Sequence, residues 1–287
     1  MKKFLIVIVL TLVSIVQAMS QVSFSEALQK ARAGEVRYQC AVGYCYETGN
    51  GTSKDTALAV YWYQQAAQQE DSVGQYMLGN CYLYGIGVKQ DMAQAVLLTS
   101  QSAAKGYALA QYRLGVMYYA GEGLTQDYQQ ALFWFTQAAS AGNKNAQIVL
   151  AEMYYNGKGT EKNDEKALYW YLQLAQDDTT PTHMRGPAQY LCGSIYKDHN
   201  YLKEAVFWLQ KAAELGYAEA QVKLARMYAE GDGVEQNTGL MLSWYIKAAK
   251  QGNKTAQQAL GVIYSTGLYG APKDIDEAEY WFEQAEH

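Results

Sequence analysis

The chain has 287 residues, of which 49 % are hydrophobic and 18 % are charged, and its formal net charge is −5. This composition is that of a globular protein, with only three prolines and no low-complexity tract. A mildly acidic chain without a cluster of Lys and Arg is a poor match for nucleic acid or for an anionic membrane, so both are excluded as partners.

Residues 1–18 have the pattern of a secretory signal peptide. Lys2 and Lys3 precede an apolar run over residues 4–16, and small residues stand at both positions that determine cleavage after Ala18. A membrane-spanning helix needs about 20 apolar residues, which is more than this run provides. We therefore expect cleavage, a net charge of −7 after the loss of two Lys and no acid, a periplasmic or secreted location, and no stable membrane insertion.

A single helix is expected before the main body of the chain. Residues 24–34, F-S-E-A-L-Q-K-A-R-A-G, have a helical pattern, and residues 19–35 are predicted to form an N-terminal capping helix that covers the adjoining helices. At the other end, Glu279, Glu283 and Glu286 make the last helix polar enough to close a repeat array.

One pattern of two helices recurs over residues 36–287. A small residue marks the first helix of each copy, at spacings of 36, 36, 36, 42, 32 and 36 residues, and a large apolar residue marks the second helix. All six tryptophans occupy this second register. A fixed period between about 20 and 50 residues is the signature of a solenoid. The first register consists of Gly43, Gly79, Gly115, Ala151, Gly193, Ala225 and Gly261, and the second of Trp62, Leu98, Trp134, Trp170, Trp208, Trp244 and Trp281.

Gly-x-Gly joins the two helices of most copies, and an acid or Asn follows it. Glycine suits the positive φ at a helix C-terminus, while Asp or Asn at the start of a helix caps its free N–H groups. A nucleotide-binding interpretation fails because no strand precedes these turns and no Lys-Ser/Thr follows them. Caps are predicted at Asp55, Asp91, Asp127, Asn163, Asn237 and Asp274.

The pattern A-x-x-x-L-G-x-x-Y-x-x-G-x-G-V-x-x-D-x-x-x-A-x-x-W-x-x-x-A-A-x-x-G resembles the Sel-1-like repeat, a relative of the tetratricopeptide repeat. The resemblance covers residues 36–287 in seven copies. It implies an all-α fold, an α/α right-handed superhelix of about seven helix-turn-helix repeats. It also implies an adaptor or receptor for other proteins, with secreted bacterial members in host contact, envelope assembly or signalling.

The link near residues 177–200 departs from the repeat. About six residues are inserted around 177–187, and K-D-H-N replaces the Gly-x-Gly turn between Gly193 and Trp208. We expect a change of pitch here. The insertion is either a binding face, as loop insertions in repeat arrays often are, or a neutral change on a solvent-exposed surface.

Residues that could perform catalysis are few. His183, His199 and His287 are the only histidines, and no metal-binding spacing or cofactor motif occurs. The fragment from Ser194 to Lys197 matches the S-x-x-K of penicillin-binding enzymes, but neither S-D-N nor K-T-G accompanies it. A non-catalytic protein without cofactor is expected. A penicillin-binding or β-lactamase-like acylase centred on Ser194 is the alternative, and a binder of cell-wall glycans is a third interpretation.

Four cysteines would face an oxidising compartment. Cys192 replaces the core Leu of its repeat and is expected to be a buried, reduced thiol. Cys40 and Cys45 stand about 140° apart around one helix. Cys45 and Cys81 are equivalent positions on adjacent helices whose axes lie about 8–10 Å apart, near the limit for a disulfide. At most one bridge is expected, among Cys40, Cys45 and Cys81. The Cys-x7-Cys spacing of a cysteine-rich branch linked to penicillin binding is absent.

The resemblance also implies where a protein or peptide partner would bind. In tetratricopeptide-like arrays the first helices line the concave side, and four positions around the small residue point into the groove. Such rows vary from Tyr to Asn to Arg, and Tyr and Arg dominate interface hot spots. Packing of some of the Tyr between helices is the alternative. The predicted groove residues are Tyr76, Asn80, Tyr112, Tyr119, Glu152, Tyr155, Asn156, Tyr190 and Arg226.

Overall fold

The computed structural model describes residues 22–286, so the predicted signal peptide over residues 1–18 lies outside the described part of the chain. The described residues form α-helices and one short 3-10 helix, without a β-strand. None of these helices is long and apolar enough to cross a membrane. Two compact units divide the chain: the first runs to Leu150 and includes Lys158–Thr160, and the second comprises Ala151–Gly157 and the chain from Glu161 onward.

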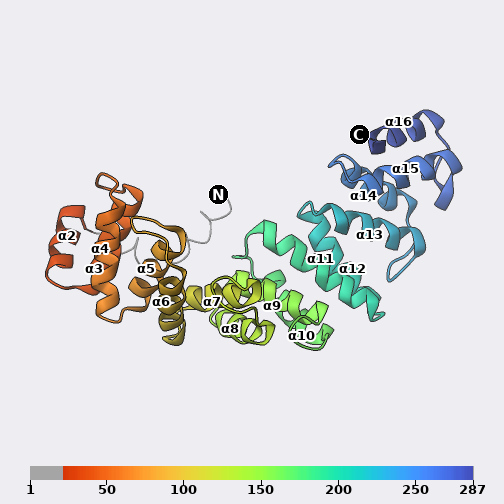
Figure 1. Ribbon diagram of the computed structural model, residues 1–287. Coiled ribbons are helices and arrows are strands. Elements are labelled where there is room, and N and C mark those ends of the chain that lie inside the picture. The colour runs from red at the N-terminus through yellow and green to blue at the C-terminus, as the bar shows by residue number, and fades with distance from the viewer. Residues whose placement is uncertain (1–21, 287) are drawn as a thin grey trace. The chain divides into compact units, whose positions relative to one another are not determined.

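The first unit consists of antiparallel helices, each packed against the next one along the chain (Figure 1). The helix α2 packs against α3, and α3, α5 and α7 are the first helices of successive repeats. The second helices are α4, α6 and α8. The bounds are α2 Phe24–Arg32, α3 Val36–Thr48, α4 Thr56–Gln68, α5 Ser72–Tyr84, α6 Met92–Ala104, α7 Ala108–Ala120 and α8 Tyr128–Ser140, followed by α9 Lys144–Asn156, within which the unit boundary falls.

The second unit repeats the same pairing of neighbouring helices from α10 to α16. Its first helices are α11, α13 and α15, and its second helices are α10, α12, α14 and α16. The bounds are α10 Asp164–Gln176, α11 Thr182–Asp198, α12 Leu202–Glu214, α13 Ala218–Glu230, α14 Thr238–Ala249, α15 Lys254–Thr266, the 3-10 helix Leu268–Gly270, and α16 Ile275–Glu286.

The two helices of a repeat touch where a small residue faces a large one. A Cβ added to Gly115 would lie 2.8 Å from the Phe135 ring, and one added to Gly43 would lie 2.6 Å from the Tyr63 ring. Phe135 and Tyr63 are fully buried in consequence. The tryptophans of the second register fill the space beside these contacts, either buried, as Trp62 is, or partly buried. The small residues therefore set how closely the helices of a repeat approach.

The turns confirm the predicted chemistry. Gly49, Gly85 and Gly121 end the first helices with positive φ, and the second glycine of each pair also has positive φ. Asp55 then accepts hydrogen bonds from two backbone N–H groups at the start of α4. The other predicted caps, Asp91, Asp127, Asn163, Asn237 and Asp274, accept equivalent bonds.

A buried glutamine joins most neighbouring repeats. Gln111 on α7 donates from Nε2 to the carbonyl of Ala103 in the last turn of α6, at 3.3 Å. Gln221 and Gln257 make the equivalent bonds at 3.0 Å, to the carbonyls of the preceding second helices. Each of these carbonyls also accepts a backbone N–H from the glycine that follows the helix, Gly106, Gly216 or Gly252. The glutamine is thus a second donor to a carbonyl that has two lone pairs. This row was not predicted from the sequence, and it also includes Gln39, Gln147 and Gln189.

The irregular segment folds differently from the insertion expected over residues 177–187. Only residues 177–181 separate α10 from α11, and the rest of the insertion extends α11 to 17 residues, with Pro187 inside it. Arg185 pairs with Asp178 at 2.7 Å across this connection. At the other end K-D-H-N closes the repeat tightly, with Asn200 at φ 63°, and α12 begins at Leu202.

The stability cost of replacing the glycine on a first helix is expected to depend on the residue that faces it on the second helix. Gly115→Ala overpacks against Phe135 and should lower the free energy of unfolding by about 1–3 kcal/mol. In the matched change, Gly79→Ala, the added Cβ lies no closer than 3.2 Å to a neighbour, Thr99 Oγ1. It should lie within about 1 kcal/mol of wild type, since Ala is also the better helix former. Urea unfolding measures both, and equal costs would contradict this packing.

Candidate partner-binding surface

The predicted groove residues of the first unit differ in how far they reach the surface. Tyr76 is buried, with 8 % of its surface exposed, and packs edge-on against Tyr107 at a centroid distance of 5.3 Å. Asn80 is partly buried. Tyr112 lies against Phe135 at 5.8 Å and remains partly exposed. Packing between helices, the alternative considered for these tyrosines, thus describes Tyr76 in this structure.

Tyr119, near the end of α7, contacts both another aromatic ring and a lysine. Its ring lies edge-on to Tyr128 at 5.3 Å, and Lys158 Nζ stands 4.1 Å from the centre of the ring. The same ammonium donates a 2.8 Å hydrogen bond to the Tyr119 hydroxyl. A lysine over an aromatic face is attracted by the ring quadrupole. The phenol is therefore held in one orientation while part of the ring stays at the surface.

In the second unit, three predicted residues share the last turns of α9. Tyr155 is partly exposed, with Lys162 Nζ 5.1 Å from its ring centre. Asn156 is exposed and donates to the backbone carbonyl of Glu152 at 2.9 Å. Glu152 reaches solvent, but desolvation of its carboxyl raises its pKa. This turn thus presents an aromatic ring, an amide and a partly desolvated acid together.

Tyr190 on α11 is the third predicted groove tyrosine with a lysine over its ring. Lys223 Nζ lies 5.3 Å from the ring centre and donates a 2.8 Å hydrogen bond to Ser194 Oγ. Tyr217 also packs against the Tyr190 ring, at a centroid distance of 5.3 Å. Burial lowers the pKa of Lys223. Arg226, one turn further along α13, is exposed.

Among the predicted groove residues, three tyrosines pair with a lysine: Tyr119 with Lys158, Tyr155 with Lys162, and Tyr190 with Lys223. The tyrosines were predicted as binding residues, whereas the lysines were not. Two of these lysines lie more than 30 positions from their tyrosine in the sequence, which is about one repeat period. Only the stacking of one repeat on the next brings such positions together.

The serine and the lysine of the S-x-x-K fragment do not contact each other in the structure. Ser194 is buried at 5 % exposure, and its hydroxyl donates to the carbonyl of Tyr190 at 2.9 Å. Lys197, the lysine of the S-x-x-K fragment, forms ion pairs with Asp232 at 3.0 Å and Glu230 at 3.9 Å instead. The serine and its expected lysine therefore bind different partners, and the acylase alternative has no support from the geometry.

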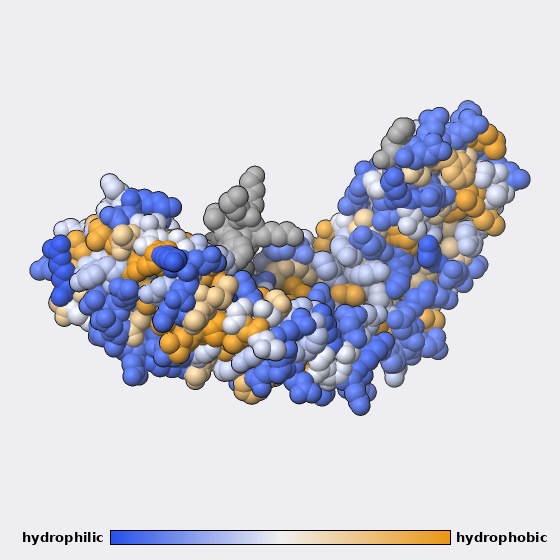
Figure 2. Space-filling view, in the orientation of Figure 1, coloured by the Kyte–Doolittle hydropathy of each residue, from blue (hydrophilic) through white to orange (hydrophobic). Residues whose placement is uncertain are grey.

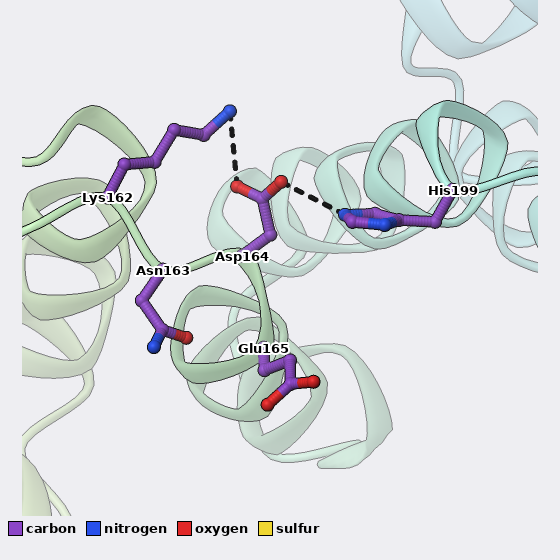
Figure 3. A pocket seen from close by; sticks show the side chains of 5 residues that line it. All are labelled: Lys162, Asn163, Asp164, Glu165 and His199. Atoms are coloured by element: carbon purple, nitrogen blue, oxygen red, sulfur yellow. Dashed lines mark hydrogen bonds and ion pairs between the residues drawn. The ribbon is translucent and has the colours of Figure 1, made fainter.

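An open pocket at the irregular link holds most of its charges in pairs (Figure 3). Asp164 lies between Lys162 Nζ, at 3.3 Å, and His199 Nε2, at 3.0 Å. Asn163 caps α10, and Glu165 is the remaining lining residue. Among residues 22–286 no cluster of His, Cys, Asp and Glu could hold a metal ion. The Asp164–His199 ion pair therefore connects the turn of one repeat to the turn of the next. His183 does not line the pocket and is exposed.

All four cysteines are free and buried, so the bridge considered among Cys40, Cys45 and Cys81 is not formed in the structure. Cys40 Sγ donates to Asp71 at 3.3 Å, and Cys81 packs in a different cluster, with Tyr63 and Leu78. Cys192 is fully buried in the position of a core Leu, as the sequence predicted.

These observations define a class of protein: an all-α solenoid whose repeats are helix pairs with a capped turn. The chain belongs to the Sel1 repeat family, because the family model of the Sel1 repeat matches residues 36–71, 72–107, 108–143, 144–178, 186–217, 218–253 and 254–286. The predicted all-α fold and its seven Sel-1-like repeats are thereby confirmed. Residues 179–185, outside the matched ranges, fall within the predicted insertion.

Similar proteins come from bacteria and yeast. A protective antigen of uropathogenic Escherichia coli, c5321, has a solved structure with a TM-score of 0.69 and 30 % identity, over 92 % of this chain and 64 % of its own. The secretory immunoglobulin A-binding protein EsiB of E. coli is 40 % identical over 70 residues, 23 % of this chain and 14 % of EsiB. Chitin synthase regulatory factor 3 of Schizosaccharomyces pombe is 33 % identical over 106 residues, 34 % of this chain and 11 % of that protein. This chain thus spans only a small part of the curated relatives.

The thiols are expected to be unreactive in the folded protein. Burial raises the pKa of Cys81 from its ordinary value of 9.0 to about 12 and also raises those of Cys40, Cys45 and Cys192. Because the thiol pKa values are higher in the folded protein than in the unfolded chain, the thiols contribute to stability while they stay protonated. This contribution is complete below about pH 9 and is lost as the pH rises toward 12. Dithionitrobenzoate at pH 8 should label the protein slowly until denaturant is added.

Four thiols should then react in denaturant without a reductant, since the structure contains four free cysteines. Two reactive thiols would instead establish the bridge among Cys40, Cys45 and Cys81. Rapid labelling before denaturation would contradict the burial of the thiols.

Proposed function

We propose that this chain is a non-catalytic adaptor that acts outside the cytoplasm and binds a protein or peptide through the predicted groove residues on its first helices. Sel1 repeat proteins are typically scaffolds for protein–protein interactions. The matched relative EsiB is a secretory immunoglobulin A-binding protein, which agrees with an extracellular protein ligand. The match covers 14 % of EsiB, so the immunoglobulin itself is not carried over.

The observation that carries the proposal is the set of tyrosine–lysine pairs. In each pair the ring is partly exposed, and a cation near its face holds it in place. A rigid tyrosine offers a large contact area and loses little rotamer entropy on binding. The neighbouring ammonium adds a donor for a carboxylate or a backbone carbonyl of the partner. This arrangement suits an extended peptide or a protein surface.

Binding is expected to depend on the pairs of the second unit. Crosslinking followed by pull-down from the envelope or secreted fraction identifies a partner, whose affinity is then measured by calorimetry. Tyr155→Ala combined with Tyr190→Ala should weaken that complex more than about tenfold, since loss of one hot spot costs about 2 kcal/mol or more.

The control for that measurement is Tyr169→Ala on the second helix α10, where the ring is 55 % exposed. It should leave the affinity unchanged, and helix content and melting temperature should stay near wild type in every variant. Unchanged affinity in the double variant would place the partner elsewhere, with residues 177–187 the next segment to test.

The location is tested separately from the partner. Mass spectrometry of the protein purified from its natural source should find Met19 at the N-terminus, because cleavage is expected after Ala18. Soluble protein from the cytoplasm that keeps residues 1–18 would remove the extracellular part of the proposal and leave the adaptor function to be judged by binding.

A further inference from the structure

The last second helix, α16, leaves one row of side chains less covered than the other second helices do. The row consists of the residue directly after the tryptophan register, which faces the small residue of the first helix. Phe282 occupies it in α16, and a Cβ added to Gly261 would lie 2.6 Å from the Phe282 ring. Phe282 is nevertheless 40 % exposed, whereas its equivalents are at most 4 % exposed. These equivalents are Tyr63, Thr99, Phe135, Tyr171, Leu209 and Tyr245.

In earlier repeats the first helix of the following repeat covers this row. The covering helix supplies a Leu and, three positions later, a second apolar residue, and two such residues lie on one face of a helix. No helix follows α16 among residues 22–286, so Phe282 lacks this cover. Three examples of the covered row are Tyr63 with Leu78 and Cys81, Leu209 with Leu224 and Met227, and Tyr245 with Leu260 and Ile263.

A second row shows the same effect at the end of the array. Ala285 is partly exposed, whereas the equivalent residues of the other second helices are fully buried. Phe282 and Ala285 stand three positions apart and therefore share one side of α16. Hydrophobic residues reach the surface between hydrophilic ones over the C-terminal helices (Figure 2). Phe282 and Ala285, with Glu279 and Glu286 beside them, are called the terminal face below.

The two acids of the terminal face replace residues that are apolar in every earlier repeat. Glu279 stands two positions before the tryptophan register, where the other second helices have Val or Leu. Glu286 stands five positions after it, where they all have Ala. In most repeats the carbonyl of this Ala accepts the buried glutamine of the next repeat. Every charged residue of α16 is an acid. The acids therefore lie beside the apolar side chains, where a following first helix would pack.

Shape and charge together determine the occupant of the terminal face. Its apolar side chains match a helix with a Leu and a second apolar residue three positions apart, because such helices cover the equivalent rows elsewhere. The acids favour Lys or Arg on that helix, since complementary charge selects the partner. A second copy that met this face with its own would oppose Glu279 and Glu286 with the same acids. An anionic membrane would be repelled in the same way.

We propose that the terminal face binds an amphipathic helix of a partner protein, which takes the place of the first helix of a following repeat. This helix carries a Leu and a second large apolar residue three positions apart, with Lys or Arg near both ends of that stripe. The face lies on α16, which holds none of the predicted groove residues. The inference therefore does not depend on the proposed adaptor function of the groove.

A synthetic helix tests the proposal without knowledge of the natural partner. The probe is a peptide with the sequence of residues 217–231, which includes Leu224 and Met227, and with the changes Glu219→Lys and Glu230→Lys. Calorimetry with the protein purified from expression of the whole chain should find one site for this lysine peptide. The peptide without the two changes should bind at least about threefold more weakly, because exposed ion pairs are individually weak but act here in the same direction. Salt should reduce the difference between the peptides.

Matched variants separate the apolar contact from the charge. Phe282→Ser should weaken binding of the lysine peptide at least about tenfold, since the ring is the apolar centre of the contact. The control is Tyr280→Ser, because Tyr280 is 49 % exposed in a row that is also exposed in earlier repeats; it should leave the affinity unchanged. Glu279→Lys combined with Glu286→Lys changes only exposed side chains. This double variant should keep its helix content and prefer the unchanged peptide, even if Phe282→Ser unfolds α16.

Three results would overturn the proposal. The first is the absence of saturable binding of the lysine peptide at about 1 mM, the concentration of a very weak complex. The second is a preference for the lysine peptide that the double lysine variant does not change. The third is a wild-type dimer in sedimentation equilibrium that Phe282→Ser dissociates, which would assign the terminal face to a second copy.

Discussion

The glutamine bond between repeats is the interaction on which the array depends. Most second helices end in a turn where one carbonyl accepts a backbone N–H, as Ala103 does from Gly106, and the next repeat packs against this end. Gln111, Gln221 and Gln257 each donate a second hydrogen bond to such a carbonyl, eight residues before the glutamine. A buried amide donor left unpaired there would cost roughly 1–3 kcal/mol. The bond therefore also fixes the register of stacking, because a shifted repeat would leave the glutamine donor unsatisfied.

In such an array, binding residues can vary only at positions that are not needed for packing or for capping the helices. The small residues, the aromatic residues facing them, the buried glutamines and the turn caps are fixed by packing and hydrogen bonding. Exposed positions of the first and second helices are not constrained in this way. In this chain they differ between the units: tyrosines beside lysines on and near the first helices, and an uncharged stretch on the second helices of the first unit only.

Much of the fold was predictable because its rules repeat. Seven occurrences of one spacing predicted the helix pairs, and the caps at Asp55 and its equivalents followed from ordinary turn chemistry. The glutamine row escaped prediction because a polar side chain inside a helix resembles a surface residue until its acceptor, on another helix, is known. The lysines over Tyr119 and Tyr190 escaped for the same reason. Burial of Tyr76 depends on contact with Tyr107, and the insertion became helix rather than loop, neither of which spacing alone determines.

Because each repeat packs only against its neighbours, the array should respond to a pulling force in a particular way. Each glutamine joins a repeat to the one before it, so a pulling force along the chain loads these bonds in series. A terminal repeat can then unfold while the adjoining repeat stays folded. The molecule therefore lengthens in discrete steps, one repeat at a time. Among the turns inside repeats, the one between α11 and α12 is the shortest, because it spans only residues 199–201, so this turn adds the least length when its two helices separate.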